Sequence, residues 1–212
     1  MAIHTICIIA FVLIVVQNLY AKPVENTTNE QELIKKILNG NPTASEKLHV
    51  FLLETMNIKP KQYAANAFNA TQYLLKDPAL LQNNNLEVTF FKDELNRVIN
   101  TYKPSATEIT TYFETMIIFS NVMEYYYQLP QDKVTSDTKF IVDLINKYDC
   151  KTLAMKIKGH YEATFTEFNK KFEEHKKDLE QPILDWYDKY AALTSTPEKL
   201  ISLLDLLSLF EI

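Results

Sequence analysis

Apolar residues recur three and four positions apart along most of this chain, the spacing of helices that bury one face. The longest such pattern runs from Leu153 to Leu179, and eight prolines lie at or near the ends of the patterns. We expect the helix at 151–180 to be the longest. The predicted helices are 30–38, 43–56, 61–75, 87–102, 105–127, 140–148, 153–179, 182–190 and 198–210.

Helix-start signals support several of these boundaries. The stretches 43–46 and 105–108 have capping-box spacing, in which a hydroxyl and a carboxylate each accept a hydrogen bond from a backbone N–H that the helix leaves free. Thr196 precedes Pro197, and proline is favoured at a first helical position. The sequence therefore predicts Thr196 as the N-cap of the last helix.

Glycine is scarce, since Gly40 and Gly159 are the only two in the chain. Tight hairpins, bulges and phosphate-binding loops all use glycine for its positive φ angles. We therefore predict an all-α fold, a single-domain helical bundle of about eight or nine helices without β-sheet. The helix at 198–210 has only a narrow polar stripe, so we expect it to pack centrally; a lipid or partner surface is the alternative.

The first 21 residues have the pattern of a secretory signal peptide, with an apolar run at 6–16 and the small residue Ala21 at the cleavage position. This run is too short to cross about 30 Å of hydrocarbon. We expect a signal peptide at 1–21, a flexible polar segment at 22–29 and one helical domain at 30–212. The protein is then secreted and extracellular, with no transmembrane segment.

Cysteine usage excludes an internal disulfide after signal removal, because Cys7 leaves with the signal and only Cys150 remains. A small apolar side chain suits the junction between two helix patterns, where Cys150 lies. We expect a buried, inert thiol and a monomer. An intermolecular disulfide and a reactive thiol are the alternatives.

Charge and motif content argue against several function classes. The net charge is -5 and Arg97 is the only arginine, so we expect no nucleic-acid binding. The three histidines beyond the signal lie far apart in sequence, and no zinc-binding motif, nucleophile elbow or phosphate-binding loop occurs. We expect no metal, no cofactor and no enzymatic activity. A hydrolase that uses Cys150 is a third and weaker class.

Two N-glycosylation sequons are consistent with export, at Asn26 and at Asn69. Asn26 lies in the polar N-terminal segment. Asn69 lies within a predicted helix, so a glycan there requires that face of the helix to be exposed.

Aromatic residues are abundant, with 12 Phe, 12 Tyr and one Trp, and three consecutive tyrosines at 125–127 must point in different directions on a helix. Such residues either fill a core or line an apolar cavity. We predict a non-enzymatic binding protein for a hydrophobic small molecule or lipid; the alternative is a protein-recognition module resembling an effector or a cytokine-like bundle. The candidates for lining a ligand pocket are Phe113, Met116, Tyr126, Phe165, Phe168, Phe172, Trp186, Leu203 and Leu207.

Overall fold

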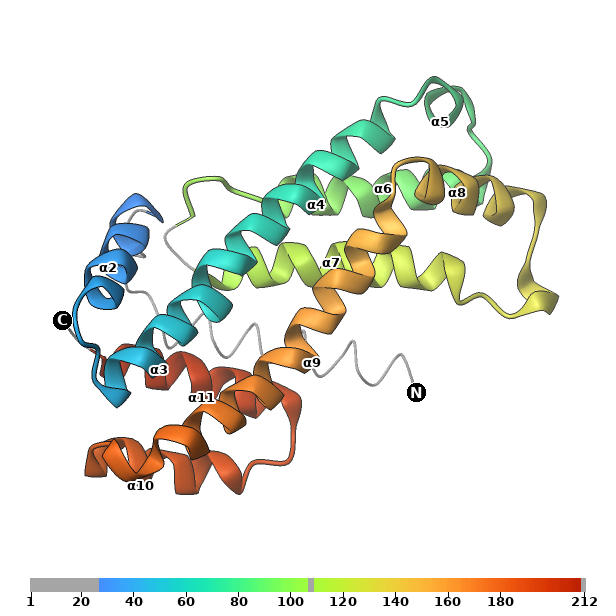
Figure 1. Ribbon diagram of the computed structural model, residues 1–212. Coiled ribbons are helices and arrows are strands. Elements are labelled where there is room, and N and C mark those ends of the chain that lie inside the picture. Colours follow the sequence, from blue (N-terminus) through green and yellow to red (C-terminus); the bar gives the residue numbers. More distant parts are fainter. Residues whose placement is uncertain (1–26, 107–108, 211–212) are drawn as a thin grey trace. The chain divides into compact units, whose positions relative to one another are not determined.

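The computed structural model describes residues 27–106 and 109–210, and within these two stretches every regular element is helical, with no strand (Figure 1). The predicted all-α helical bundle is confirmed. The α-helices are α2 (Thr27–Asn39), α3 (Ala44–Leu52), α4 (Lys59–Leu75), α5 (Pro78–Gln82), α6 (Leu86–Thr101), α7 (Ile109–Tyr127), α8 (Ser136–Lys147), α9 (Cys150–His175), α10 (Gln181–Ala191) and α11 (Thr196–Leu209). One π-helical turn, η1 (Leu53–Ile58), and two 3-10 turns, η2 (Gln131–Lys133) and η3 (Lys176–Asp178), accompany them.

The helices form two compact units. Unit 1 contains the described residues up to Lys59 together with those from Glu162 onward, and unit 2 is Pro60–Tyr161. Helix α9 contributes its first part to unit 2 and its second part to unit 1. The predicted signal peptide and the positions 22–26 lie outside the described residues, and the boundaries proposed for the single domain stay a prediction.

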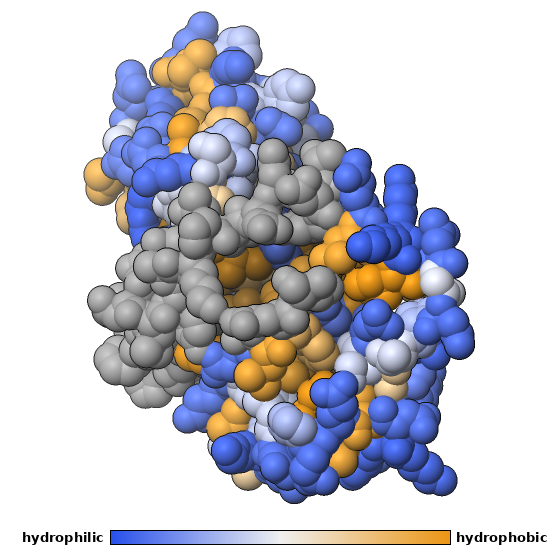
Figure 2. Space-filling model, turned by 90° about the vertical axis from the view of Figure 1, so that its left-hand side faces the viewer, coloured by the Kyte–Doolittle hydropathy of each residue, from blue (hydrophilic) through white to orange (hydrophobic). Residues whose placement is uncertain are grey.

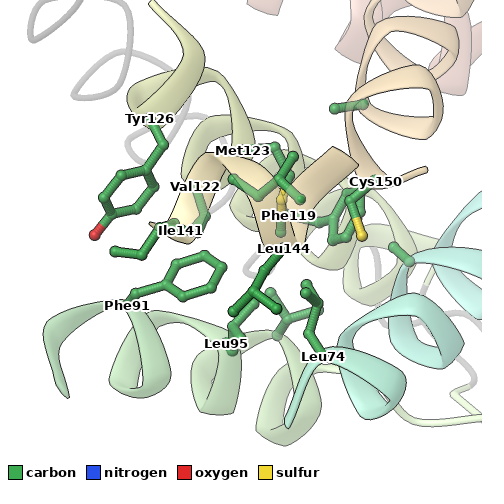
Figure 3. Packing of buried hydrophobic residues seen from close by; sticks show 14 of the residues in the cluster. Leu74, Phe91, Leu95, Phe119, Val122, Met123, Tyr126, Ile141, Leu144 and Cys150 are labelled. Carbon is green, nitrogen blue, oxygen red and sulfur yellow. The ribbon is translucent and has the colours of Figure 1, made fainter. Parts of the chain in front are cut away.

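Unit 2 is organised around α6 and α7, which lie side by side, with α8 packed against both (Figure 1). Its core holds Leu74, Leu95, Phe119 and Leu144, which point toward one another (Figure 3). Complete burial of large apolar side chains is the main favourable contribution to folding. The apolar residues that recur three and four positions apart in the sequence therefore form the buried core of this unit.

Unit 1 places α11 against α3, η1 and α10, and α2 against α3. Leu203 and Leu206 are fully buried, but Leu200 and Leu204 are partly exposed and the side chain of Leu209 is 56% exposed. The expectation that this helix packs centrally is therefore wrong. Its neighbours cover one face of the helix and leave much of its apolar surface in contact with solvent.

Helix caps agree with the sequence at one of the three predicted sites. The Thr43 N–H donates to the Glu46 carboxylate at 2.8 Å, and the Glu46 N–H donates to the Thr43 hydroxyl at 3.2 Å. The predicted cap at Thr196 is wrong, because the Ser195 hydroxyl accepts from the Glu198 N–H and so places Pro197 at the second helical position. In the third stretch, 105–108, positions 107 and 108 lie outside the described residues.

The predicted break between the helices at 43–56 and 61–75 is absent, since α3, η1 and α4 follow one another without a loop. In an ordinary α-helix the ring of Pro60 would clash with the carbonyl four residues earlier. Here the chain winds more widely before the proline, and the Lys59 N–H bonds the Glu54 carbonyl five residues back. The π turn therefore allows the helical chain to continue through Pro60, where a helix end was predicted.

Gly159 lies on the exposed side of α9, which at 26 residues is the longest helix in the described part of the chain, as predicted. A Cβ added there meets no atom within 4 Å. We therefore expect Gly159→Ala to raise the free energy of unfolding by about 0.5–1 kcal/mol, because alanine loses less backbone entropy in a helix. Urea denaturation checks this, with Gly40→Ala beyond the end of α2 as a control that changes less. A loss of stability in the Gly159 variant contradicts the prediction.

Candidate functional site

Six aromatic side chains of unit 1 contact one another and form what we call the Phe168 cluster. Helix α9 contributes two of the rings, α10 contributes three, and α3 contributes one. Residues four apart on α9 and three or four apart on α10 share a helix face, so these spacings direct the rings into one group. The members are Phe51, Phe168, Phe172, Trp186, Tyr187 and Tyr190.

The geometry of the cluster combines edge-on and stacked ring pairs. Phe168 is fully buried and meets Trp186 edge-on at 5.7 Å and Tyr190 edge-on at 5.4 Å between centroids. Phe172 and Tyr187 are stacked at 3.6 Å, and Trp186 and Tyr190 at 5.0 Å. Both arrangements are favourable for aromatic pairs. Phe168 is thus the residue on which the others converge.

Solvent reaches the cluster at Trp186 and Tyr187, which are only half-buried. Lysine ammonium groups lie over three of the rings: Lys171 Nζ is 5.5 Å from the centroid of Phe51, Lys176 Nζ is 5.9 Å from that of Tyr187, and Lys199 Nζ is 6.0 Å from that of Tyr190. Cations over aromatic faces are attracted by the ring quadrupole. The exposed edge of the cluster therefore combines apolar ring surface with positive charge.

The hydroxyl of Tyr190 is buried and has no hydrogen-bond partner within the described chain. Burial, with a smaller contribution from the neighbouring Tyr187, raises the pKa of Tyr190 to about 12. Like an ordinary tyrosine, the group is protonated at neutral pH and can donate a hydrogen bond. Buried hydroxyls are normally bonded, so an unbonded one at the centre of an aromatic cluster is unusual.

The structure divides the predicted pocket residues between the two units. Phe168, Phe172 and Trp186 belong to the Phe168 cluster, and three further candidates in unit 1 are Phe165, Leu203 and Leu207. Leu207 packs instead against a separate apolar cluster, made of Ile34, Ile37, Val50, Leu53 and Ile58. The candidates in unit 2, all buried on α7, are Phe113, Met116 and Tyr126.

Three members of the Phe168 cluster were missed as site residues, namely Phe51, Tyr187 and Tyr190. The spacing of Trp186 and Tyr190, four apart on one helix, was the available signal for Tyr190. No sequence signal connects Phe51 on α3 to Phe168 on α9.

A second titratable group of note, Asp77, lies at the start of α5 and is almost completely buried. Its carboxylate accepts hydrogen bonds from Lys147 Nζ at 2.7 Å, from the Tyr148 hydroxyl at 2.8 Å and from the Ala79 N–H at 2.8 Å. The Lys147 bond is the largest influence, and together these bonds lower the pKa of Asp77 to about 2. All its partners belong to the fold, which makes it a structural residue.

Among the described residues, no three His, Cys, Asp or Glu side chains are grouped so as to hold a metal ion. None of the helices there combines the length and apolar character needed to cross a bilayer. The tyrosine run behaves as predicted, since Tyr125 is 53% exposed, Tyr126 is buried and Tyr127 is intermediate.

Cys150 is fully buried at the start of α9, and its thiol donates to the Tyr148 carbonyl at 3.6 Å. Burial, reinforced by Asp149, raises the pKa of Cys150 to about 12. Because the thiolate is the reactive form, we expect negligible labelling by a thiol reagent at pH 8 in native protein and full labelling in urea. The protein should also migrate identically on reducing and non-reducing gels. Rapid native labelling or a reducible dimer band would contradict the prediction.

The sequon at Asn69 lies on α4, where the Asn69 side chain is exposed. Thr71, by contrast, is fully buried and its hydroxyl donates to the Ala67 carbonyl at 2.8 Å. Because the transferase must reach both residues, the folded helix is a poor substrate and we expect modification before folding. Protein secreted by eukaryotic cells should lose the mass of one glycan in Asn69→Gln. An unchanged mass counts against the site, and Asn26→Gln tests the other sequon, which lies outside the described residues.

Comparison of the chain with protein-family models, with curated proteins and with solved structures gives no match.

Proposed function

We propose that this protein is a secreted, non-enzymatic binding protein that carries or sequesters a hydrophobic small molecule or lipid. The observation that carries the proposal is the Phe168 cluster, in which five rings of α9 and α10 gather and two of them, Trp186 and Tyr187, remain half-buried. Aromatic side chains with a few polar groups are typical of sites for apolar ligands. The same unit also has partly exposed apolar side chains on α11.

Trp186 makes the proposal directly testable because it is the only tryptophan in the chain. A brominated fatty acid that binds at the Phe168 cluster should quench its fluorescence, while the unbrominated acid should compete. Native mass spectrometry of protein from its own source should show a co-purifying apolar ligand. An empty protein that neither takes up fluorescent fatty acids nor responds to the brominated one would disprove the carrier function.

A matched pair of tyrosine variants distinguishes the site from general surface binding. Tyr187→Ala removes a ring of the cluster, whereas Tyr73→Ala removes an exposed ring in unit 2. We expect uptake of a fluorescent fatty acid to fall about tenfold in the first variant, because a stacked aromatic surface is lost, and to be unchanged in the second. Circular dichroism checks that both variants are folded.

A second candidate function, protein recognition, is favoured by exposed apolar residues in unit 2. Leu86 is 89% exposed and Phe90, one turn later on α6, is 51% exposed. Apolar side chains also reach the surface between hydrophilic ones on the face in Figure 2. Exposed apolar groups of this kind often mark protein interfaces. Cross-links from a co-purified protein to α6 that disappear in Phe90→Asp would support this function over the first.

A further inference from the structure

We propose that the ligand of the Phe168 cluster carries an acceptor oxygen, as a carbonyl, carboxyl or ether group does, and that the Tyr190 hydroxyl donates a hydrogen bond to it. This inference rests on the proposed carrier function and names the chemistry of its ligand. The ligand is then an amphipathic molecule whose apolar body lies against the rings and whose oxygen meets Tyr190.

In the free protein the Tyr190 hydroxyl is buried without a partner among the described residues. Tyr190 is 1% exposed, and its oxygen bonds nothing in the described chain. A phenylalanine could make the same ring contacts with Phe168 and Trp186 without burying a polar group. The hydroxyl therefore costs stability where it stands, and an incoming acceptor would recover that loss.

The Tyr190 hydroxyl and its surroundings favour a ligand with an acceptor oxygen. Like an ordinary tyrosine, Tyr190 is protonated at neutral pH, and so its hydroxyl offers a proton to an acceptor. The Lys199 ammonium lies 6.0 Å from the centroid of the same ring. A nearby cation favours an electron-rich oxygen and disfavours a cationic ligand.

Trp186 lies between Tyr190 and solvent, since it stacks on Tyr190 at 5.0 Å and is itself half-buried. In the proposed complex the ligand takes the place of the Trp186 ring in this stack and so meets the ring and hydroxyl of Tyr190. Binding then changes the surroundings of the single tryptophan, which makes its emission a local reporter.

The test uses the full chain and two compounds of nearly equal shape, 2-acetylnaphthalene and 2-ethylnaphthalene; the first has a carbonyl group where the second has a methylene group. Calorimetric titration of the native protein should show the ketone binding about tenfold more tightly than the hydrocarbon. Tyr190→Phe should abolish this preference by weakening only the ketone, and it should raise the melting temperature of the free protein. Tyr187→Phe, whose hydroxyl belongs to a half-buried ring, should keep the preference.

Different binding results would refute the inference and the carrier function. Equal affinity of the native protein for both compounds, or a preference that survives in Tyr190→Phe, overturns the inference while binding itself stands. A lower melting temperature in Tyr190→Phe also overturns it, because the hydroxyl then has a partner in the free protein. If neither compound binds but a fluorescent fatty acid does, the carrier function stands and the inference fails. If nothing binds, both fail.

Discussion

Replacing Phe168 by alanine is expected to remove about 3–5 kcal/mol from the free energy of unfolding, the usual cost of emptying a fully buried phenylalanine site. The ring is completely buried and touches five other aromatic rings, so its loss leaves a cavity where α3, α9 and α10 contribute side chains. Urea unfolding followed by Trp186 fluorescence reports on this region, because Trp186 meets Phe168 edge-on at 5.7 Å.

Phe90→Ala is the matched control for Phe168→Ala, since the Phe90 side chain is 51% exposed on α6. Its effect should stay within about 0.5 kcal/mol, the usual range for surface substitutions. Equal losses in the two variants would show that Phe168 does not organise the packing of its unit.

Replacing Asp77 by alanine is expected to cost about 2–4 kcal/mol, because the change removes an N-cap and the acceptor of two side-chain hydrogen bonds, one of them from the partly buried Tyr148 hydroxyl. The carboxylate caps α5 and also bonds Lys147 and Tyr148, about seventy positions later in the chain. Thermal unfolding measures the loss. Glu173→Ala, which removes an exposed carboxylate 3.4 Å from Lys176, should change little.

Acid should remove the contribution of Asp77. Its pKa is lowered from an ordinary value of 3.8 to about 2, so the folded state binds the proton less tightly than the unfolded chain does. The stabilisation is then fully present above about pH 4 and is lost as the pH falls toward 2. The stability difference between the native protein and Asp77→Asn should shrink over this interval, and a constant difference would contradict the assignment.

Helical periodicity predicted most of the fold because an amphipathic helix is encoded by nearby residues. Periodicity did not predict two features, the π turn before Pro60 and the short helix α5. A π turn accommodates Pro60 within the helical chain, and the spacing of apolar residues does not indicate such a turn. The short helix α5 was not predicted, although Asp77 and Pro78 form a cap and a first-turn proline, because five residues are too few to show a period.

The candidate site was predictable only in part, and for a physical reason. Spacing on one helix placed Phe165, Phe168 and Phe172 in one stripe, and of these Phe168 and Phe172 belong to the cluster. The spacing of residues on α9 does not indicate which other helix packs against this face. Phe113 and Met116 show the same periodicity yet lie in the other unit, and the unbonded hydroxyl of Tyr190 becomes visible only once its neighbours are placed.

Unit 2 is one continuous stretch of chain, whereas unit 1 combines an early segment with a late one. During synthesis, unit 2 has all its residues once Tyr161 has emerged, and domains generally fold as units. Helices α2 and α3 must wait for the late segment, since Phe51 meets Phe168 and Leu207 joins the apolar cluster of Ile34 and Val50. In a nascent chain the apolar faces of α2 and α3 therefore stay exposed until the late segment has been made. We expect a chaperone that binds the nascent chain to bind these faces.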